Sequence, residues 1–69
     1  MSKFNIRIKE LRLEKELSLQ QVADDFSVGI RTILRWEAGE TEPKLDTVIA
    51  LAKYFEVSSD YLLGIVDEI

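Results

Sequence analysis

Apolar side chains recur along this chain with the spacing of helices, and no segment alternates with the two-residue period of a strand. Five segments carry the helical period, and we expect a helix in each. They are residues 3–15, a segment that begins at Ser18 and ends at Phe26, Ile30 to Glu37 or Ala38, about Leu45 to Phe55, and Ser59–Leu63. The pattern predicts an all-α fold: a compact five-helix domain over residues 1–64, followed by a short apolar C-terminal tail over residues 65–69.

Local signals agree with these boundaries. Gln21 follows Ser18 by three residues, which is the spacing of a capping box at the start of a helix. Gly39 is of the residue type that commonly ends a helix, and Pro43 disfavours helix just before it. The apolar faces predict a core made of Phe4, Ile8, Leu11, Leu19, Val22, Ala23, Phe26, Ile33, Trp36, Leu45, Val48, Leu51, Ala52 and Phe55, closed by Tyr61, Leu62 and Leu63.

Ile6 and Leu13 lie off this core stripe. They are seven residues apart and share a face roughly opposite the apolar face of the first segment. Scattered exposed apolar side chains are common, so the two residues need no function. The alternative is a small patch that contacts a partner or the C-terminal tail, and the sequence leaves both interpretations open.

The composition excludes several kinds of site. The chain has no cysteine and no histidine, which excludes disulfides and metal sites built from Cys or His. No glycine-rich phosphate loop is present, so we expect no enzyme, no cofactor, no metal and no small-molecule substrate. No apolar run approaches the roughly 18 residues of a membrane span. The N-terminus also lacks the apolar centre of a signal peptide, so we expect a cytoplasmic protein without membrane contact.

Charge is divided unevenly between the two halves of the chain. Residues 1–35 carry seven Lys or Arg and five Asp or Glu, whereas residues 36–69 carry two and eight. The net charge of −4 argues against a generic binder of polyanions. Basic character is confined to the N-terminal half, which is consistent with a protein that binds DNA through one face.

The stretch from Leu17 to Gly39 carries the clearest candidate chemistry. It predicts two short helices with a tight break between them. In the second helix Ile33 and Trp36 face inward. Arg31 and Arg35 are four residues apart and project together from the outer side. An element with an apolar back and a cationic front suits the major groove of DNA, where arginine can donate two hydrogen bonds to guanine.

Three phrases of the sequence, in this order, carry a family resemblance: LSLQQVA, RWEAGETEPKLDTVIALAKYF and VSSDYLLG. Over residues 4–64 the chain resembles the phage-repressor type of helix-turn-helix domain, the Cro/repressor or Xre family. The resemblance implies the lambda-repressor-like DNA-binding fold. In that fold the second helix lies across the DNA backbone and the third enters the major groove.

Carried over position by position, the resemblance also implies site residues. The residues expected to contact bases are Ile30, Arg31 and Arg35, with Leu34 nearby. The residues expected to contact phosphates are Arg12, Gln20, Thr32 and Lys44. The buried ion pair that the family has between the first helix and the end of the third corresponds to Arg12 and Glu37.

The chain departs from the family pattern at several positions. Leu19 stands where a glutamine usually touches phosphate, so Gln20 beside it is the expected substitute. Ser27 stands where the family favours glycine, and a left-handed backbone there costs about 1 kcal/mol. Gly29 replaces the usual Ser or Thr cap of the third helix, and the loop after that helix carries two glutamates where the family is often basic.

Two functions are consistent with these features. The first is a sequence-specific, DNA-binding transcriptional regulator of phage Cro/repressor type. It would bind double-stranded operator DNA as a homodimer, with the dimer contacts in residues 61–69 because the chain ends soon after the fifth helix. The second is an antirepressor, a partner-binding module that keeps the fold but binds a second repressor protein. The candidate dimer or partner surface consists of Ile6, Leu13, Tyr61, Ile65, Val66 and Ile69.

Overall fold

Five helices follow one another in the computed structural model, which describes residues 3–69, and no strand occurs in that part of the chain. They are α1 (Phe4–Glu14), α2 (Leu19–Asp25), α3 (Ile30–Ala38), α4 (Leu45–Tyr54) and α5 (Ser59–Leu63). The predicted all-α fold is confirmed, because each helix begins and ends within one residue of its expected bounds. Residues 1–2 of the domain expected over 1–64 lie outside the described residues.

The helix ends carry the local chemistry that the sequence predicts. Ser18 Oγ accepts a hydrogen bond from the Gln21 backbone N–H at 3.0 Å, and Gln21 Oε1 accepts one from the Ser18 N–H at 2.9 Å, which completes the capping box. At the start of α5, Ser58 Oγ accepts a hydrogen bond from the Tyr61 backbone N–H at 3.0 Å. Gly39 and Gly64 end α3 and α5 with φ of 77° and 81°, a left-handed conformation that glycine adopts without a Cβ clash.

The turn between α2 and α3 is tight and strained. Ser27 has φ of 54°, the left-handed conformation expected at this position. The Val28 N–H donates to the Ala23 carbonyl at 2.9 Å and thereby closes the end of α2. Gly29 then caps α3 with extended backbone and no side-chain hydrogen bond. The whole reversal takes four residues, which fixes α3 closely against α2.

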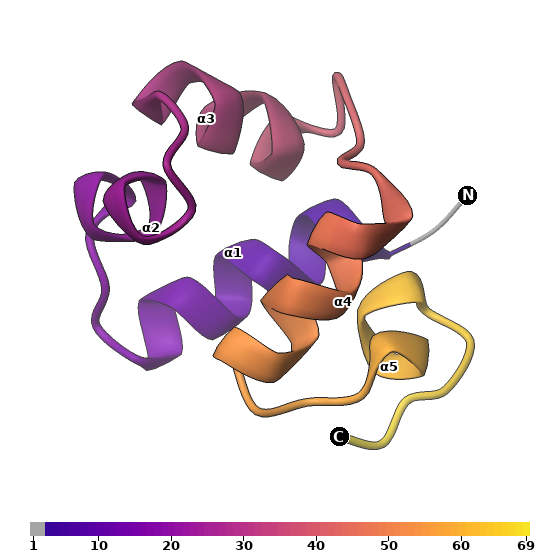
Figure 1. The fold of residues 1–69 in the computed structure, drawn as a ribbon. Helices are drawn as coiled ribbons and strands as arrows, with labels where there is room; N and C mark the ends of the chain where they lie inside the picture. The colour runs from indigo at the N-terminus through magenta and orange to yellow at the C-terminus, as the bar shows by residue number, and fades with distance from the viewer. Residues whose placement is uncertain (1–2) are drawn as a thin grey trace.

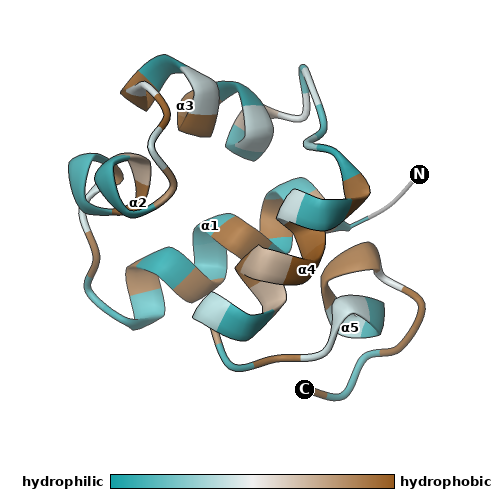
Figure 2. Ribbon diagram, in the orientation of Figure 1, coloured by the Kyte–Doolittle hydropathy of each residue, from teal (hydrophilic) through white to brown (hydrophobic). Residues whose placement is uncertain are grey.

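Helix α1 runs through the middle of the molecule (Figure 1). The α2–α3 pair lies on one side of it and the α4–α5 pair on the other, with direct contacts of α1 to α3 and to α5. The hydropathy colouring shows teal and brown positions on every helix (Figure 2), the amphipathic pattern from which the helices are predicted. None of the helices described is long and apolar enough to cross a bilayer.

The core follows the predicted apolar faces with one clear exception. The buried apolar residues are Phe4, Ile8, Leu11, Val22, Ala23, Ile33, Trp36, Val48, Leu51, Ala52, Phe55 and Leu62, and Leu19, Phe26, Tyr61 and Leu63 are half-buried against them. The expectation for Leu45 is wrong, since its side chain is 66% exposed. Leu45 is the first residue of α4, and the buried residues of this helix begin one turn later, at Val48. Helical spacing identifies the inner face of a helix but not where its neighbours stop covering it.

Candidate nucleic-acid interface

The inner face of α3 is buried in the core, and this leaves two arginines on its outer face. Ile33 and Trp36 are 1% and 6% exposed, which fixes the rotation of α3 about its own axis. With about 100° between successive residues, Arg31 and Arg35 must then lie on the solvent side. Both are exposed, and both come from a helix that α1 and α2 hold from behind.

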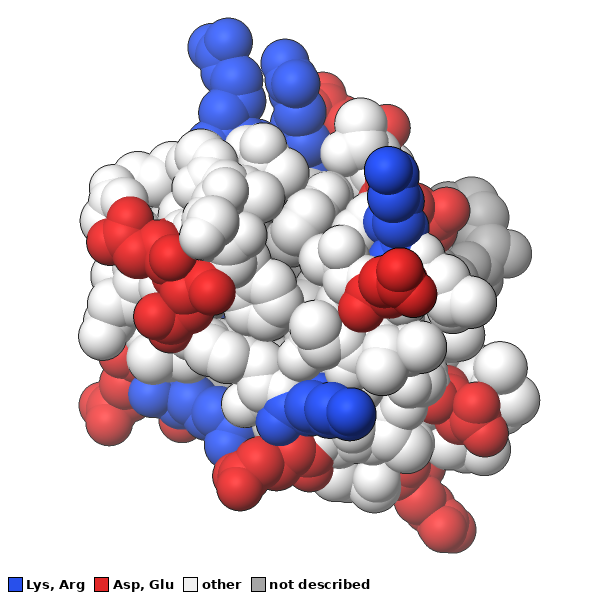
Figure 3. All heavy atoms as spheres, in the orientation of Figure 1, with Lys and Arg blue, Asp and Glu red and all other residues white. Residues whose placement is uncertain are grey.

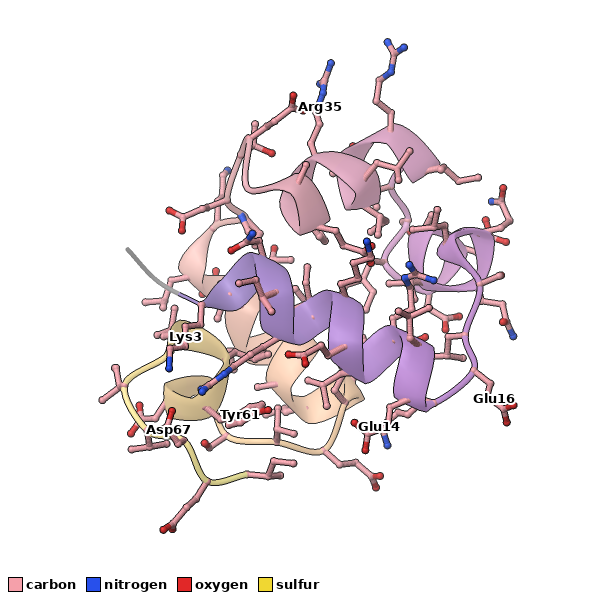
Figure 4. The ribbon with its side chains drawn as sticks, turned by 180° about the vertical axis from the view of Figure 1, so that it is seen from behind. Lys3, Glu14, Glu16, Arg35, Tyr61 and Asp67 are labelled. Atoms are coloured by element: carbon pink, nitrogen blue, oxygen red, sulfur yellow. The ribbon has the colours of Figure 1, made fainter. Side chains whose placement is uncertain are left out.

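The side chains of Arg31 and Arg35 make no hydrogen bond or ion pair to any other residue in the described part of the chain. Two cationic side chains project together from the end of the molecule that α3 occupies (Figure 3). Seen from behind, Arg35 points directly away from the body of the protein (Figure 4). The donors of these guanidinium groups are therefore available to an external acceptor.

The other two arginines of the chain, Arg7 and Arg12, are buried and committed to the fold. Arg12 Nε donates to Glu37 Oε2 at 2.7 Å and Arg12 Nη2 donates to Glu37 Oε1 at 3.1 Å. Arg12 Nη1 donates to the Leu17 carbonyl at 3.1 Å. The hydrogen bonds to Glu37 raise the pKa of Arg12 against the opposing effect of burial. Arg12 thus ties α1 both to α3 and to the loop that leads into α2.

This arrangement contains the ion pair that the family resemblance implies for Arg12 and Glu37, with side chains 11% and 7% exposed. All three guanidinium nitrogens of Arg12 already donate within the protein. Its structural role is therefore visible in the fold, and its contact to phosphate stays a prediction.

The remaining predicted phosphate contacts lie at helix starts near the outer surface. Gln20 is exposed in the first turn of α2, and its Nε2 donates to Asp24 Oδ1 at 2.7 Å. Thr32 is half-buried in the first turn of α3. Lys44 is exposed and is the N-cap residue of α4, with no side-chain capping bond. Leu19, where the family has glutamine, is half-buried against the core and offers no donor.

Two apolar residues stand beside the arginines on α3. Ile30 is 36% exposed and Leu34 is 47% exposed. Both are large apolar residues that lie at the surface and outside the core. The outer face of α3 therefore combines two guanidinium groups with two aliphatic side chains.

Sequence reasoning did not find the role of Arg7, which is 7% exposed. Its Nη1 donates to the carbonyls of Tyr61 and Val66, the latter at 2.6 Å, and its Nη2 donates to Asp67 Oδ1 at 2.8 Å. The guanidinium carbon lies 4.1 Å from the centre of the Tyr61 ring. A signal was present, because Arg7 occupies the apolar stripe of α1 three residues after Phe4 and four before Leu11.

These contacts fasten the C-terminal tail to α1. Lys3 Nζ adds a second contact to Asp67, at 3.3 Å. Hydrogen bonding to Arg7 and then to Lys3 lowers the pKa of Asp67. Figure 4 shows Lys3, Tyr61 and Asp67 together at the side of the molecule away from Arg35.

The candidate partner surface falls into two groups. Ile6 and Leu13 are each 57% exposed on the outer side of α1. Ile65, Val66 and Ile69 are 67%, 39% and 67% exposed on the fastened tail, and Tyr61 is half-buried beneath Arg7. Both groups therefore present apolar side chains at the surface of the protein.

Known proteins share both the sequence and this arrangement. The helix-turn-helix family HTH_3 matches residues 8–62. The chain is 43% identical over 54 residues to the cryptic phage CTXphi transcriptional repressor RstR of Vibrio cholerae, and the match covers 78% of this chain and 49% of RstR. The chain thus spans about half the length of that relative.

Two solved structures are similar in fold. A transcriptional regulator from Listeria innocua has a TM-score of 0.89 at 35% identity and covers all of this chain, which corresponds to 64% of that one. The P22 c2 repressor, solved in complex with a synthetic operator, has a TM-score of 0.80 at 32% identity, over 87% of this chain and 91% of the repressor chain.

Proposed function

The chain belongs to the helix-turn-helix family HTH_3, of the Cro/repressor (Xre) type, and on this premise we propose that it is a transcriptional regulator that binds operator DNA through α3 in the major groove. One observation carries the proposal: the side chains of Arg31 and Arg35 are exposed, adjacent on one face and without a hydrogen bond or ion pair to the described residues. Arginine can grip the O6 and N7 atoms of guanine with two hydrogen bonds, a contact that discriminates between bases. Such a regulator works in the cytoplasm and needs no catalytic group.

The net charge of −4 does not oppose this role. Arg31 and Arg35 are exposed together on the outer face of α3, whereas the carboxylate of Asp67 is held by Arg7 and Lys3 on the far side of the molecule, so the cationic character is local to α3. Gln20, Thr32 and Lys44 supply the proposed phosphate contacts, and Arg12 a further one, around the α2–α3 pair. In the similar P22 c2 complex the bound molecule is a synthetic operator, which supports the same class of ligand here.

We further propose a homodimer on DNA, formed through the fastened tail. The exposed apolar residues Ile65, Val66 and Ile69 support this surface, since Arg7 holds the segment in a defined position. Two copies double the buried DNA surface and read a palindrome. Sedimentation of the protein with and without a palindromic duplex tests the stoichiometry, and one copy per full site contradicts the dimer.

The DNA-binding proposal is tested by titrating Arg35→Ala against two duplexes. One is a duplex selected by the wild-type protein from a random-sequence pool, and the other is a scrambled duplex of the same composition. Loss of one bidentate contact should weaken binding to the selected duplex by at least fivefold and leave the scrambled duplex nearly unchanged. Lys53→Ala, an exposed cation on α4, is the matched control. Equal losses on both duplexes contradict base reading by Arg35.

A second function is favoured by the exposure of Ile6 and Leu13, each 57% accessible on a face that the fold does not use. In this alternative the protein is an antirepressor that binds a second repressor protein. Gel shifts with the DNA that flanks the gene, run with and without a neighbouring repressor, distinguish the two. A stable complex with the repressor and no DNA binding alone supports the alternative.

A further inference from the structure

The outer face of α3 carries two parallel rows of side chains. Arg31 and Arg35 form a cationic row, and Ile30 and Leu34 form an apolar row, each with a four-residue step. At about 100° per residue, all four side chains fall within an arc of roughly 140°. The centre of that arc lies roughly opposite buried Trp36. The face that meets a ligand is therefore half aliphatic.

Core packing does not explain the apolar row. Ile33 and Trp36 already fill the inner side of α3, and Leu34 remains 47% exposed although it follows Ile33 directly. Full burial of such a side chain is worth about 1.5–3 kcal/mol, so its exposure leaves a large apolar contact unused. The residues beside this apolar row on the same outer arc are Arg31 and Arg35.

These neighbours restrict what the apolar row can contact. A purely apolar protein partner would bury Arg31 and Arg35 without acceptors, which is costly. The major groove of DNA offers both chemistries side by side: guanine O6 and N7 accept from arginine, and the C5-methyl group of thymine is an apolar surface. Thymine is the one base among the four that presents a methyl group there.

We propose that Leu34, assisted by Ile30, recognises thymine methyl groups next to the guanines that Arg31 and Arg35 contact. The proposal rests on the proposed function and adds a specificity residue to it. A four-residue step advances about 6 Å along the helix axis, close to two base-pair steps of about 3.4 Å. The preferred half-site therefore contains guanine and thymine positions interleaved within about four base pairs.

The experiment uses the duplex that the wild-type protein selects from a random-sequence pool. Each thymine in the half-site is replaced in turn by uracil, which removes the methyl group and keeps every hydrogen-bonding group. Burial of one methyl-sized group corresponds to about a fourfold change in affinity. We expect wild-type affinity to fall by about this factor at one or two thymines. At the thymine that Leu34 contacts, replacement by uracil should cause no further loss of affinity for the Leu34→Ala variant.

Ile49→Ala is the matched control, because Ile49 is 39% exposed but lies on α4, away from the outer face of α3. This control should keep the full uracil effect. The inference is overturned if uracil changes wild-type affinity at no position, or if Leu34→Ala keeps the same uracil loss as the wild type. In either case the Arg35→Ala result still decides the proposed function separately. A pool that yields no enriched sequence refutes sequence-specific binding itself.

Discussion

Arg12 of α1 and Glu37 of α3 face each other through two hydrogen bonds, of 2.7 and 3.1 Å, in a site where both side chains are almost completely buried. Glu37 lies between Trp36, which faces the core, and the C-terminal end of α3. The pair therefore fixes the C-terminal end of α3, the helix that we propose enters the major groove. It connects the stability of the fold to the orientation of the functional face.

Glu37→Gln should lower the free energy of unfolding by about 3 kcal/mol. The substitution keeps the shape of the side chain but leaves the buried Arg12 guanidinium without its counter-charge. Urea titration followed by circular dichroism measures the change. For a domain of this size the loss is a large part of the total stability.

The double variant Arg12→Met/Glu37→Leu serves as its control. Replacing a buried ion pair by apolar side chains of similar volume is often close to neutral. The double variant should therefore be more stable than Glu37→Gln alone. If the stability lost in the double variant equals the sum of the losses in Arg12→Met and Glu37→Leu, the two side chains act independently.

Asp67→Asn should loosen the C-terminal tail in a pH-dependent way. Hydrogen bonds from Arg7 and Lys3 hold the pKa of Asp67 below its ordinary value of 3.8. A carboxyl group with a lowered pKa in the folded state stabilises that state at all pH values above its ordinary pKa, and this contribution is lost as pH falls through the folded pKa. The stability difference between wild type and Asp67→Asn should thus be constant near neutral pH and decline as pH falls from 3.8 through the lower folded pKa.

Thermal unfolding from pH 7 to pH 2.5 measures this difference. Glu68→Gln is the matched control, since Glu68 is adjacent and exposed but forms no hydrogen bond or ion pair with the described residues. A difference for Asp67→Asn that persists unchanged at the acid end would show that its carboxylate charge is not what fastens the tail.

Tyr54 gives the opposite pH dependence. Its hydroxyl donates to Asp25 Oδ2 at 2.7 Å, which joins α4 to α2. Burial, followed by this hydrogen bond, raises the pKa of Tyr54 from 10.0 to about 12. A raised pKa contributes stability below the ordinary value that is lost as pH rises through the folded value. Tyr54→Phe should cost about 1 kcal/mol at pH 7 and progressively less between pH 10 and 12.

Guanidinium titrations at pH 7, 10 and 11.5 provide the comparison. Tyr61→Phe is the control variant, because the Tyr61 hydroxyl makes no hydrogen bond to the described residues. If Tyr54→Phe and Tyr61→Phe lose the same stability at every pH, the bond to Asp25 contributes nothing.

The helices and most of the core could be predicted because their causes are local. The capping box at Ser18 and the apolar spacing of each segment act within a few residues, and both are present in the structure. Leu45 and Arg7 were missed because their environments are set at a distance. Whether Leu45 is buried depends on how far the neighbouring helices extend over the start of α4. The burial of Arg7 depends on the C-terminal segment, whose carbonyls at residues 61 and 66 accept hydrogen bonds from Arg7.

The site divides in the same way. The outward direction of Arg31 and Arg35 follows from helical spacing once Ile33 and Trp36 are assigned to the core. The partnership of Arg12 with Glu37 does not follow from spacing, since 25 residues separate them, and it was inferred from family resemblance. Local periodicity can thus predict which residues are available to a ligand, whereas the residues that position them require tertiary contacts.

Lys44→Gln should weaken DNA binding equally for all sequences and make it less dependent on salt. Lys44 is the exposed N-cap residue of α4, where a phosphate would meet both its ammonium group and the backbone N–H groups at the start of the helix. Each phosphate that a lysine neutralises adds about 0.9 to the slope of log K against log salt concentration. Fluorescence anisotropy between 50 and 200 mM salt should therefore give a slope smaller by about one for Lys44→Gln. Lys53→Gln is the matched control, because it removes the same charge from the other end of α4 and should leave the slope unchanged. Equal slopes for Lys44→Gln and Lys53→Gln would show that the N-terminus of α4 does not contact the DNA backbone.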